Sequence, residues 1–143
     1  MTTERTLIVF KPDAMERGII GDILSRFERA GLRVVQAKVC CPDKALLDQH
    51  YQVETLAPII GQKSKDAGTD VGPDLAAYGR MVLGWNQTTM MRLPVLAMVL
   101  EGTFAISRVR TLLGATDPQK AAPGTIRGDL GMDSIALANT EKR

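Results

Sequence analysis

Apolar and polar positions along the chain predict strands and helices in alternation. Thr6 to Phe10 is a short apolar run rich in β-branched residues, typical of a buried strand, and it ends at Pro12 and Asp13. Val95 to Leu100 is apolar throughout, which favours a central strand. From Val35 to Val39 apolar residues alternate with polar ones, which predicts a third strand with one face in water.

After each of these strands, apolar residues recur at the spacing of an α-helix. A helix is expected from about Gly21 to Ala30, and another from Ile106 to Leu113. Gly31 and Gly114 stand where left-handed C-terminal caps belong. After Pro42 and Asp43 a short helix is expected to carry four residues on one face: Leu46, Leu47, His50 and Tyr51.

The stretch from about residue 61 to residue 94 has the composition of an insertion. Its first part is polar and rich in glycine, and its second part has apolar and aromatic residues near helical spacing, which predicts a loop followed by an amphipathic helix. Residues 115–124 are predicted to form a long loop, and only scattered apolar residues follow Gly124. The order of elements indicates an α/β sandwich with helices on one face of a sheet, whose last strand is missing.

Composition narrows the class of protein. The 143 residues are 45% hydrophobic and carry a net charge of +2, which fits one soluble domain over residues 1–143 and gives no reason to expect nucleic acid or a membrane as partner. No apolar run is long enough to span a bilayer and the start does not resemble a signal peptide, so a cytoplasmic location is expected. The two cysteines, Cys40 and Cys41, are adjacent and offer neither a disulfide framework nor a spaced metal-ligand cluster.

Four polar residues lie next to the expected elements without an obvious packing role: Lys11, Arg110, Thr116 and Arg127. Guanidinium groups bind phosphate oxygens in pairs and a lysine adds a mobile point charge, so these residues are a candidate phosphate site. The alternative is ordinary solvated surface charge.

The other candidate residues have structural alternatives. His50 is the only histidine and is either packed or catalytic, and Tyr51 is either a core ring or a ligand contact. Four aspartates could hold Mg²⁺ or could cap turns, without the spacing of a known metal loop: Asp13, Asp117, Asp129 and Asp133. The chain has neither a Walker A loop nor a dinucleotide glycine fingerprint.

Five blocks taken together resemble nucleoside diphosphate kinase. In chain order they are ERTLIVFKPDAMERGIIGDILSRFERAGLRVV, DQHY, VLAMVLEG, LLGATDP and PGTIRGD. The insertion beginning IGQK and the tail DSIALANTEKR resemble a subgroup with a longer middle region, found in archaeal and some bacterial members. The resemblance implies a ferredoxin-like α+β sandwich with an antiparallel, four-stranded sheet.

The same resemblance implies an activity and a set of roles. Family members are homo-oligomers that move the γ-phosphate of a nucleoside triphosphate such as ATP to a nucleoside diphosphate through phosphohistidine, with Mg²⁺ held by the phosphates. Lys11 is expected at the terminal phosphate and Tyr51 beside the nucleophile, both as supporting catalytic residues. Arg110, Thr116 and Arg127 are expected to bind the phosphates.

The chain departs from the family pattern in two places. Pro58-Ile59-Ile60 stands where the family has a Pro-Phe-Phe whose ring stacks on the base, so Ile59 is the expected base contact, with Tyr78 or Trp85 as other sources of stacking. The Asn-x-x-His-x-Ser motif of the phosphoacceptor is absent, and His50 matches a different family histidine. The kinase is therefore expected to have its phosphoacceptor beyond Arg143, which would leave these 143 residues inactive alone. The alternative is a non-catalytic nucleotide-binding or oligomerisation module.

Overall fold

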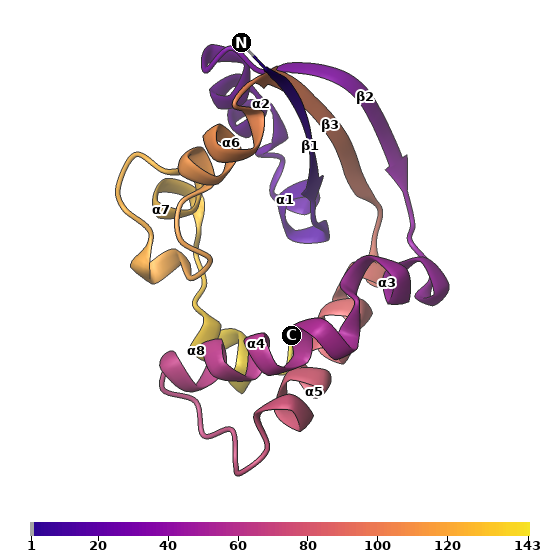
Figure 1. Cartoon of the computed structure of the whole chain (residues 1–143), viewed down its shortest axis with the longest axis vertical. Helices are drawn as coiled ribbons and strands as arrows, with labels where there is room; N and C mark the ends of the chain where they lie inside the picture. Colours follow the sequence, from indigo (N-terminus) through magenta and orange to yellow (C-terminus); the bar gives the residue numbers. More distant parts are fainter. Residues whose placement is uncertain (1) are drawn as a thin grey trace. The chain divides into compact units, whose positions relative to one another are not determined.

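The computed structural model describes residues 2–143, which form two compact units. The sheet unit comprises residues 2–40 and Pro94–Met132. The helical unit comprises Cys41–Leu93 and Asp133–Arg143. The chain passes from the sheet unit into the helical unit, returns, and passes over again near its C-terminus, so each unit is built from two segments (Figure 1).

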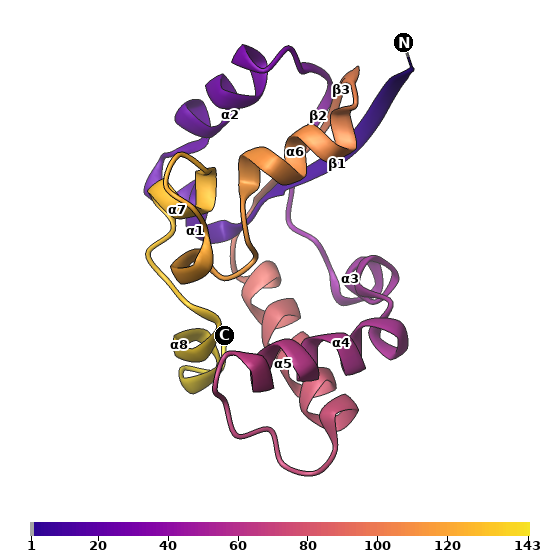
Figure 2. The same ribbon diagram turned by 60° about the vertical axis from the view of Figure 1, so that its left-hand side comes forward.

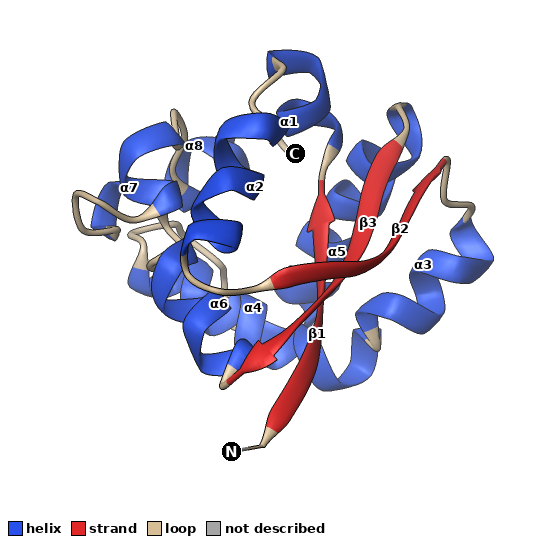
Figure 3. Ribbon diagram, turned by 90° about the horizontal axis from the view of Figure 1, so that it is seen from above, coloured by secondary structure: helices blue, strands red, loops and turns tan. Residues whose placement is uncertain are grey.

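A three-stranded antiparallel sheet is the centre of the sheet unit. Strands β1 (Thr3–Phe10) and β2 (Arg33–Cys40) lie on either side of β3 (Val95–Thr103), as the red arrows of Figure 3 show. Met98 in β3 is the register partner of Ile8 in β1 and of Ala37 in β2. The central place of the apolar run from Val95 to Leu100 confirms the prediction.

Helices α2 (Ile20–Arg29) and α6 (Ala105–Leu113) cover one face of this sheet, and Figure 2 shows α6 lying along the strands. Both helices end before a glycine with a φ of +80°, Gly31 and Gly114, which confirms the predicted stops. Gly114 has a ψ of −172°, so it does not form the left-handed cap predicted there. The core between helices and sheet includes these residues: Ile8, Phe10, Ile23, Phe27, Met98, Leu100, Ala105 and Val109. Burial of these apolar side chains holds the helices on the sheet.

Strand β2 differs from the regular alternation that the sequence predicts. Its pairing with β3 shifts register between Val34 and Gln36, so Val35 occupies a bulge. Val39 is 60% exposed rather than covered. As an edge strand with a bulge, β2 does not present one continuous apolar face to the core.

The rest of the sheet unit consists of three short helical segments: α1 (Pro12–Arg17), η1 (Pro118–Lys120) and α7 (Ile126–Leu130). Ile126 of α7 is buried in the same core as α2 and α6. The segment after Gly124, where the sequence shows only scattered apolar residues, is therefore partly helical. Residues 2–143 form three strands, against the four that the family resemblance implies.

The helical unit contains α3 (Lys44–Tyr51), α4 (Val53–Asp66), α5 (Leu75–Arg92) and α8 (Ile135–Thr140). Asp43 caps α3 by accepting from the Leu46 backbone N–H at 2.8 Å, which fits the predicted start of this helix. Helix α5 confirms that a helix forms in the second part of residues 61–94. The loop before it is shorter than predicted, because α4 continues through Gly61 to Asp66.

Glycines allow α4 and α5 to approach each other closely. A Cβ on Gly61 would lie 2.0 Å from the Leu75 carbonyl oxygen, and a Cβ on Gly79 would lie 1.8 Å from the Ala57 carbonyl oxygen. Gly61 is thus a packing residue inside a helix, although the sequence pattern indicated a loop there.

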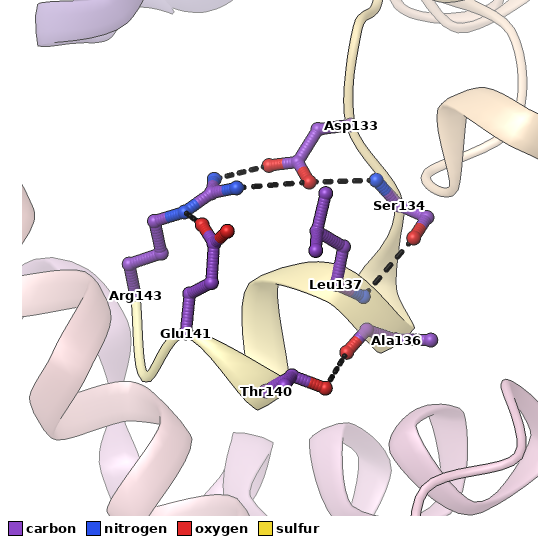
Figure 4. A network of polar contacts seen from close by, with 7 residues as sticks. All are labelled: Asp133, Ser134, Ala136, Leu137, Thr140, Glu141 and Arg143. Atoms are coloured by element: carbon purple, nitrogen blue, oxygen red, sulfur yellow. Dashed lines mark hydrogen bonds and ion pairs between the residues drawn. The ribbon is translucent and has the colours of Figure 1, made fainter.

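Side-chain contacts hold the C-terminal segment of the helical unit together (Figure 4). Ser134 caps α8 by accepting from the Leu137 backbone N–H at 3.0 Å. Arg143 pairs with both Asp133 and Glu141. Residues 133–143 therefore form a closed local structure around α8.

Among residues 2–143, no helix has both the length and the apolar character needed to cross a lipid bilayer.

Candidate functional site

Lys11 lies where β1 ends and α1 begins, next to Pro12 at the first helical position. The residue is exposed, yet protein atoms crowd its ammonium group, and this desolvation is the main cause that lowers the pKa of Lys11. The carboxylate of Asp13 raises this pKa, and the positive charge of Arg127 lowers it further. Lys11 is therefore a cation whose surroundings do not fully compensate its charge.

Arg127 projects from α7 and is half-buried. One of its guanidinium nitrogens donates to the carbonyl oxygen of Gly114 at 3.1 Å, directly after α6. Desolvation lowers the pKa of Arg127, and the nearby charge of Arg110 lowers it as well. The hydrogen bond to Gly114 fixes one end of the guanidinium fork and leaves further N–H groups for a ligand.

Arg110 and Thr116 complete the predicted phosphate-binding set in the sheet unit. Arg110 is in the last turn of α6 and Thr116 is in the loop that follows, and both are exposed. The positive charge of Arg127 lowers the pKa of Lys11, and the positive charge of Arg110 lowers the pKa of Arg127, so Arg127 interacts electrostatically with both. In the described part of the chain, none of these three cations forms an ion pair with a carboxylate.

This group, called here the cation cluster (Lys11, Arg110 and Arg127), is suited to bind an anion. Three positive charges, of which only that of Lys11 is acted on by a carboxylate, that of Asp13, leave a net positive local potential. A polyphosphate offers several oxygens to guanidinium forks and to the ammonium group, which are the donors that bind it best.

The turn that precedes Arg127 is tightly built. The Thr125 hydroxyl donates to the Ala122 carbonyl oxygen at 2.6 Å and accepts from the Gly128 backbone N–H at 3.0 Å, which caps α7. A Cβ on Gly128 would lie 2.1 Å from the Ala122 carbonyl oxygen. The PGTIRGD sequence thus forms a compact turn in which larger residues do not fit at Gly128.

Three of the four candidate Mg²⁺ aspartates have local or ion-pair roles. Asp117 is buried and caps η1, Asp129 accepts from Gly124 and Arg26, and Asp133 accepts from Ser134 and pairs with Arg143. Within residues 2–143, no three His, Cys, Asp or Glu side chains converge on a point where they could hold a metal ion.

The remaining predicted site residues belong to the helical unit. Tyr51 is half-buried, and this burial raises the pKa of its hydroxyl. His50 is exposed and its ring lies edge-on to that of Tyr51, with centroids 5.0 Å apart. Ile59 on α4 is 49% exposed, so it is available for contact with a ligand.

Tyr78 and Trp85 face each other along α5. The ring centroids of Tyr78 and Trp85 lie 6.2 Å apart in an edge-to-face arrangement, and both residues are half-buried. The two rings contact each other, as aromatic pairs commonly do, and their stacking on a base stays a prediction.

Two contacts around α7 could not be found from the sequence. Arg26 of α2 donates to Asp129 at 2.8 Å, and Arg17 of α1 donates to the Leu130 carbonyl oxygen at 2.8 Å. These partners are 103 and 113 residues apart in the sequence, and no local pattern links them.

Comparison with known proteins gives a consistent result. The family model described as nucleoside diphosphate kinase matches residues 4–65 and 78–140. A nucleoside diphosphate kinase from Pyrococcus horikoshii is 41% identical over 138 residues, which are 96% of this chain and 73% of that protein.

Solved structures agree with the sequence relatives. The crystal structure of an NDP kinase from Pyrobaculum aerophilum has a TM-score of 0.90 at 37% identity, covering 99% of this chain and 84% of that one. A nucleoside diphosphate kinase from Borrelia burgdorferi, described as a transition-state mimic with bound vanadate and ADP, has a TM-score of 0.78 at 35% identity, covering 98% of this chain and 73% of that one. The α+β fold with an antiparallel sheet is that of these enzymes, and the chain belongs to the nucleoside diphosphate kinase family.

Proposed function

We propose that this protein transfers the terminal phosphate of a nucleoside triphosphate to a nucleoside diphosphate, and that the cation cluster binds the phosphates. The observation that carries this proposal is the electrostatic interaction of Arg127 with both Lys11 and Arg110, three cations that form no ion pair with a carboxylate in residues 2–143. The Borrelia relative, whose structure contains ADP and vanadate, supports the same ligand class.

Each residue has a distinct part in this proposal. Arg127 and Arg110 bind phosphate oxygens, and Thr116 adds a hydroxyl donor. Lys11 stabilises the charge that develops on the transferring group, because its ammonium is only partly compensated. Tyr51 and Ile59 belong to the helical unit, and their proposed roles beside the nucleophile and at the base rest on the family resemblance.

The phosphoacceptor is proposed to be a histidine outside residues 1–143. His50 is the only histidine of these residues, and the family resemblance assigns it to a different motif. Transfer through phosphohistidine forms an N–P bond as the bond to the leaving diphosphate breaks, and a second nucleotide then accepts the phosphoryl group. Residues 1–143 alone are accordingly proposed to bind nucleotides without turnover.

Mg²⁺ is proposed to arrive with the nucleotide, held by its phosphates. The residues fit this arrangement, since the cation cluster can bind the phosphates, while Asp117 and Asp129 already accept hydrogen bonds from backbone N–H groups and, for Asp129, from Arg26. When bound, Mg²⁺ neutralises part of the phosphate charge.

Two further proposals concern assembly and subgroup. Self-association is proposed, with exposed apolar residues such as Val39 and Phe104 available for contact, and light scattering of the purified protein tests it. Membership in the subgroup with a longer middle region is supported by residues 66–77, which the family model leaves unmatched.

The transfer proposal is tested by incubating the full gene product with labelled ATP and a nucleoside diphosphate. Label is expected in the new triphosphate and in an acid-labile phosphoenzyme, and none in either for the 143-residue chain. Absence of label in both products of the full gene product would contradict the proposal. Turnover by a homogeneous 143-residue chain would contradict the assignment of the phosphoacceptor outside it.

Lys11→Ala in the full gene product separates binding from chemistry. If Lys11 acts mainly in the transition state, this variant lowers kcat much more than it raises the Kd for ADP. Lys38→Ala, in exposed strand β2, is the matched control and leaves both quantities unchanged.

A further inference from the structure

We propose that Asp129 and Arg26 form a positioning pair that orients Arg127 for phosphate binding. This inference rests on the proposed function, because it concerns how one of the proposed phosphate ligands is held. The pair joins helix α2 to the turn and helix that carry Arg127.

Helix α7 needs outside support to keep a fixed orientation. It has only five residues, and an isolated helix of this length is not stable in water. Ile126, buried in the core, and Leu130, packed against it, fix one side of the helix, but the entry turn before Ile126 has no such apolar anchor and is fixed by polar contacts.

Asp129 supplies these contacts at both ends of the turn. One carboxylate oxygen accepts from the Gly124 backbone N–H at 2.8 Å, and the other accepts from Arg26 at 2.8 Å. The first contact closes the chain from Gly124 to Asp129 into a ring around the α7 cap. The second ties that ring to α2, whose Phe27 is fully buried in the core.

The charges are consistent with this arrangement. The Gly124 N–H and then the Arg26 guanidinium lower the pKa of Asp129, so the carboxylate is charged at neutral pH. Arg26 also lies 3.7 Å from Asp22 on its own helix, which orients its side chain. A charged hydrogen-bonded pair of this kind is stronger than a neutral one.

The consequence for the site is specific. Arg127 is two residues from Asp129, and its guanidinium reaches Gly114 at 3.1 Å. Loosening of the Gly124–Asp129 ring shifts the backbone of Arg127 and with it the free N–H groups that face a ligand. Asp129 is thus a positioning residue that acts through Arg127 and is not itself a ligand for phosphate.

The test is calorimetric titration of the 143-residue chain with ADP and with adenosine. Asp129→Asn is expected to weaken ADP binding by about 3- to 10-fold, in the range of coupling between contacting residues, and to leave adenosine binding unchanged. In a protein that already carries Arg127→Ala, Asp129→Asn should weaken ADP binding by less than about 2-fold further, because the residue through which Asp129 acts is absent.

Asp133→Asn is the matched control. Asp133 also accepts from a backbone N–H and pairs with an arginine, and its side chain is 34% exposed against 35% for Asp129. This variant should leave ADP binding unchanged, and thermal unfolding measured on each variant shows how much stability each loses.

The outcomes separate the two proposals. If Arg127→Ala leaves ADP binding unchanged, the proposed phosphate site is wrong. If Arg127→Ala weakens binding while Asp129→Asn does not, or if the two losses add in the double variant, the positioning pair is overturned and the phosphate site stands.

Discussion

Two groups of cations in the sheet unit differ in what surrounds them. Arg5 and Arg33 both pair with Glu101, which lies between them in the register of β1, β3 and β2. Arg127 interacts electrostatically with Lys11 and with Arg110, and none of the three forms an ion pair with a carboxylate in residues 2–143, although the charge of Asp13 acts on Lys11. The first group joins the three strands of the sheet by ion pairs. The second group raises the local positive electrostatic potential and joins no structural elements by ion pairs.

This difference separates structural charge from functional charge. Folding gains little from like charges held together, so a cluster whose positive charge is only partly compensated favours an anionic ligand. Substitutions in the paired group are expected to change stability. Substitutions in the unpaired group are expected to change nucleotide affinity.

The largest expected effect is on nucleotide affinity. Arg127→Ala and Arg110→Ala should each weaken ADP binding by about 1.5 to 3 kcal/mol, the usual range for a hydrogen bond to a charged group. Calorimetry measures this loss, and Arg33→Ala is the control from the paired group. Equal affinity losses in all three variants would remove the distinction between the two groups.

A second variant, Gly128→Ala, affects the turn that supports Arg127. Its Cβ would lie 2.1 Å from the Ala122 carbonyl oxygen, so the backbone must shift. Overpacking of this kind costs about 1 to 3 kcal/mol of folding free energy, and ADP affinity should fall as well. Gly21→Ala is the control, because a Cβ there meets no atom within 4 Å. Denaturant unfolding that gives equal stability for both variants would contradict the tight turn.

A smaller effect is expected from the paired group. Glu101→Gln removes the charge that Arg5 and Arg33 share and should lower the Tm while leaving ADP affinity unchanged. Differential scanning calorimetry and the same titration measure the two quantities. A weakened affinity at unchanged Tm would assign Glu101 to the ligand site instead.

The smallest effect is a pH dependence of stability. Hydrogen bonds from Arg5 and then Arg33 lower the pKa of Glu101 in the folded state. The contribution of the Glu101 carboxylate to stability is therefore complete above the ordinary pKa of a glutamate, about 4.3. It is lost as the pH falls through the lower pKa that Glu101 has in the folded state. The free energy of unfolding can be measured for the parent chain and for Glu101→Gln at neutral and at acidic pH. The difference in this free energy between the two proteins should be smaller at acidic pH. A constant difference would contradict this linkage.

The sheet unit could largely be predicted from the sequence because its signals are local. The apolar run of β3 and the glycine stops of α2 and α6 depend only on neighbouring residues. Strand β2 was less predictable, since its bulge at Val35 and the 60% exposure of Val39 follow from its place at the sheet edge.

The helical unit shows a different limit. Gly61 indicated a loop, yet it lies inside α4 because the Leu75 backbone packs where a side chain would be. A glycine required by close packing and a glycine required by a turn have the same sequence signal.

For the candidate site, residue types were predictable and geometry was not. Lys11, Arg110, Thr116 and Arg127 were found from their positions and the family resemblance. Their approach, and the contact of Arg26 with Asp129 across 103 residues, depend on the folded chain.

Titration of the 143-residue chain with ATP, ADP and adenosine, followed by calorimetry, tests the central claim most directly. If the cation cluster binds phosphates, affinity should rise from adenosine to ADP by about 100-fold or more, in keeping with two or more charge-assisted hydrogen bonds. It should also fall with added salt, because the attraction is electrostatic. Equal affinity for adenosine and ADP, independent of salt, would contradict the account.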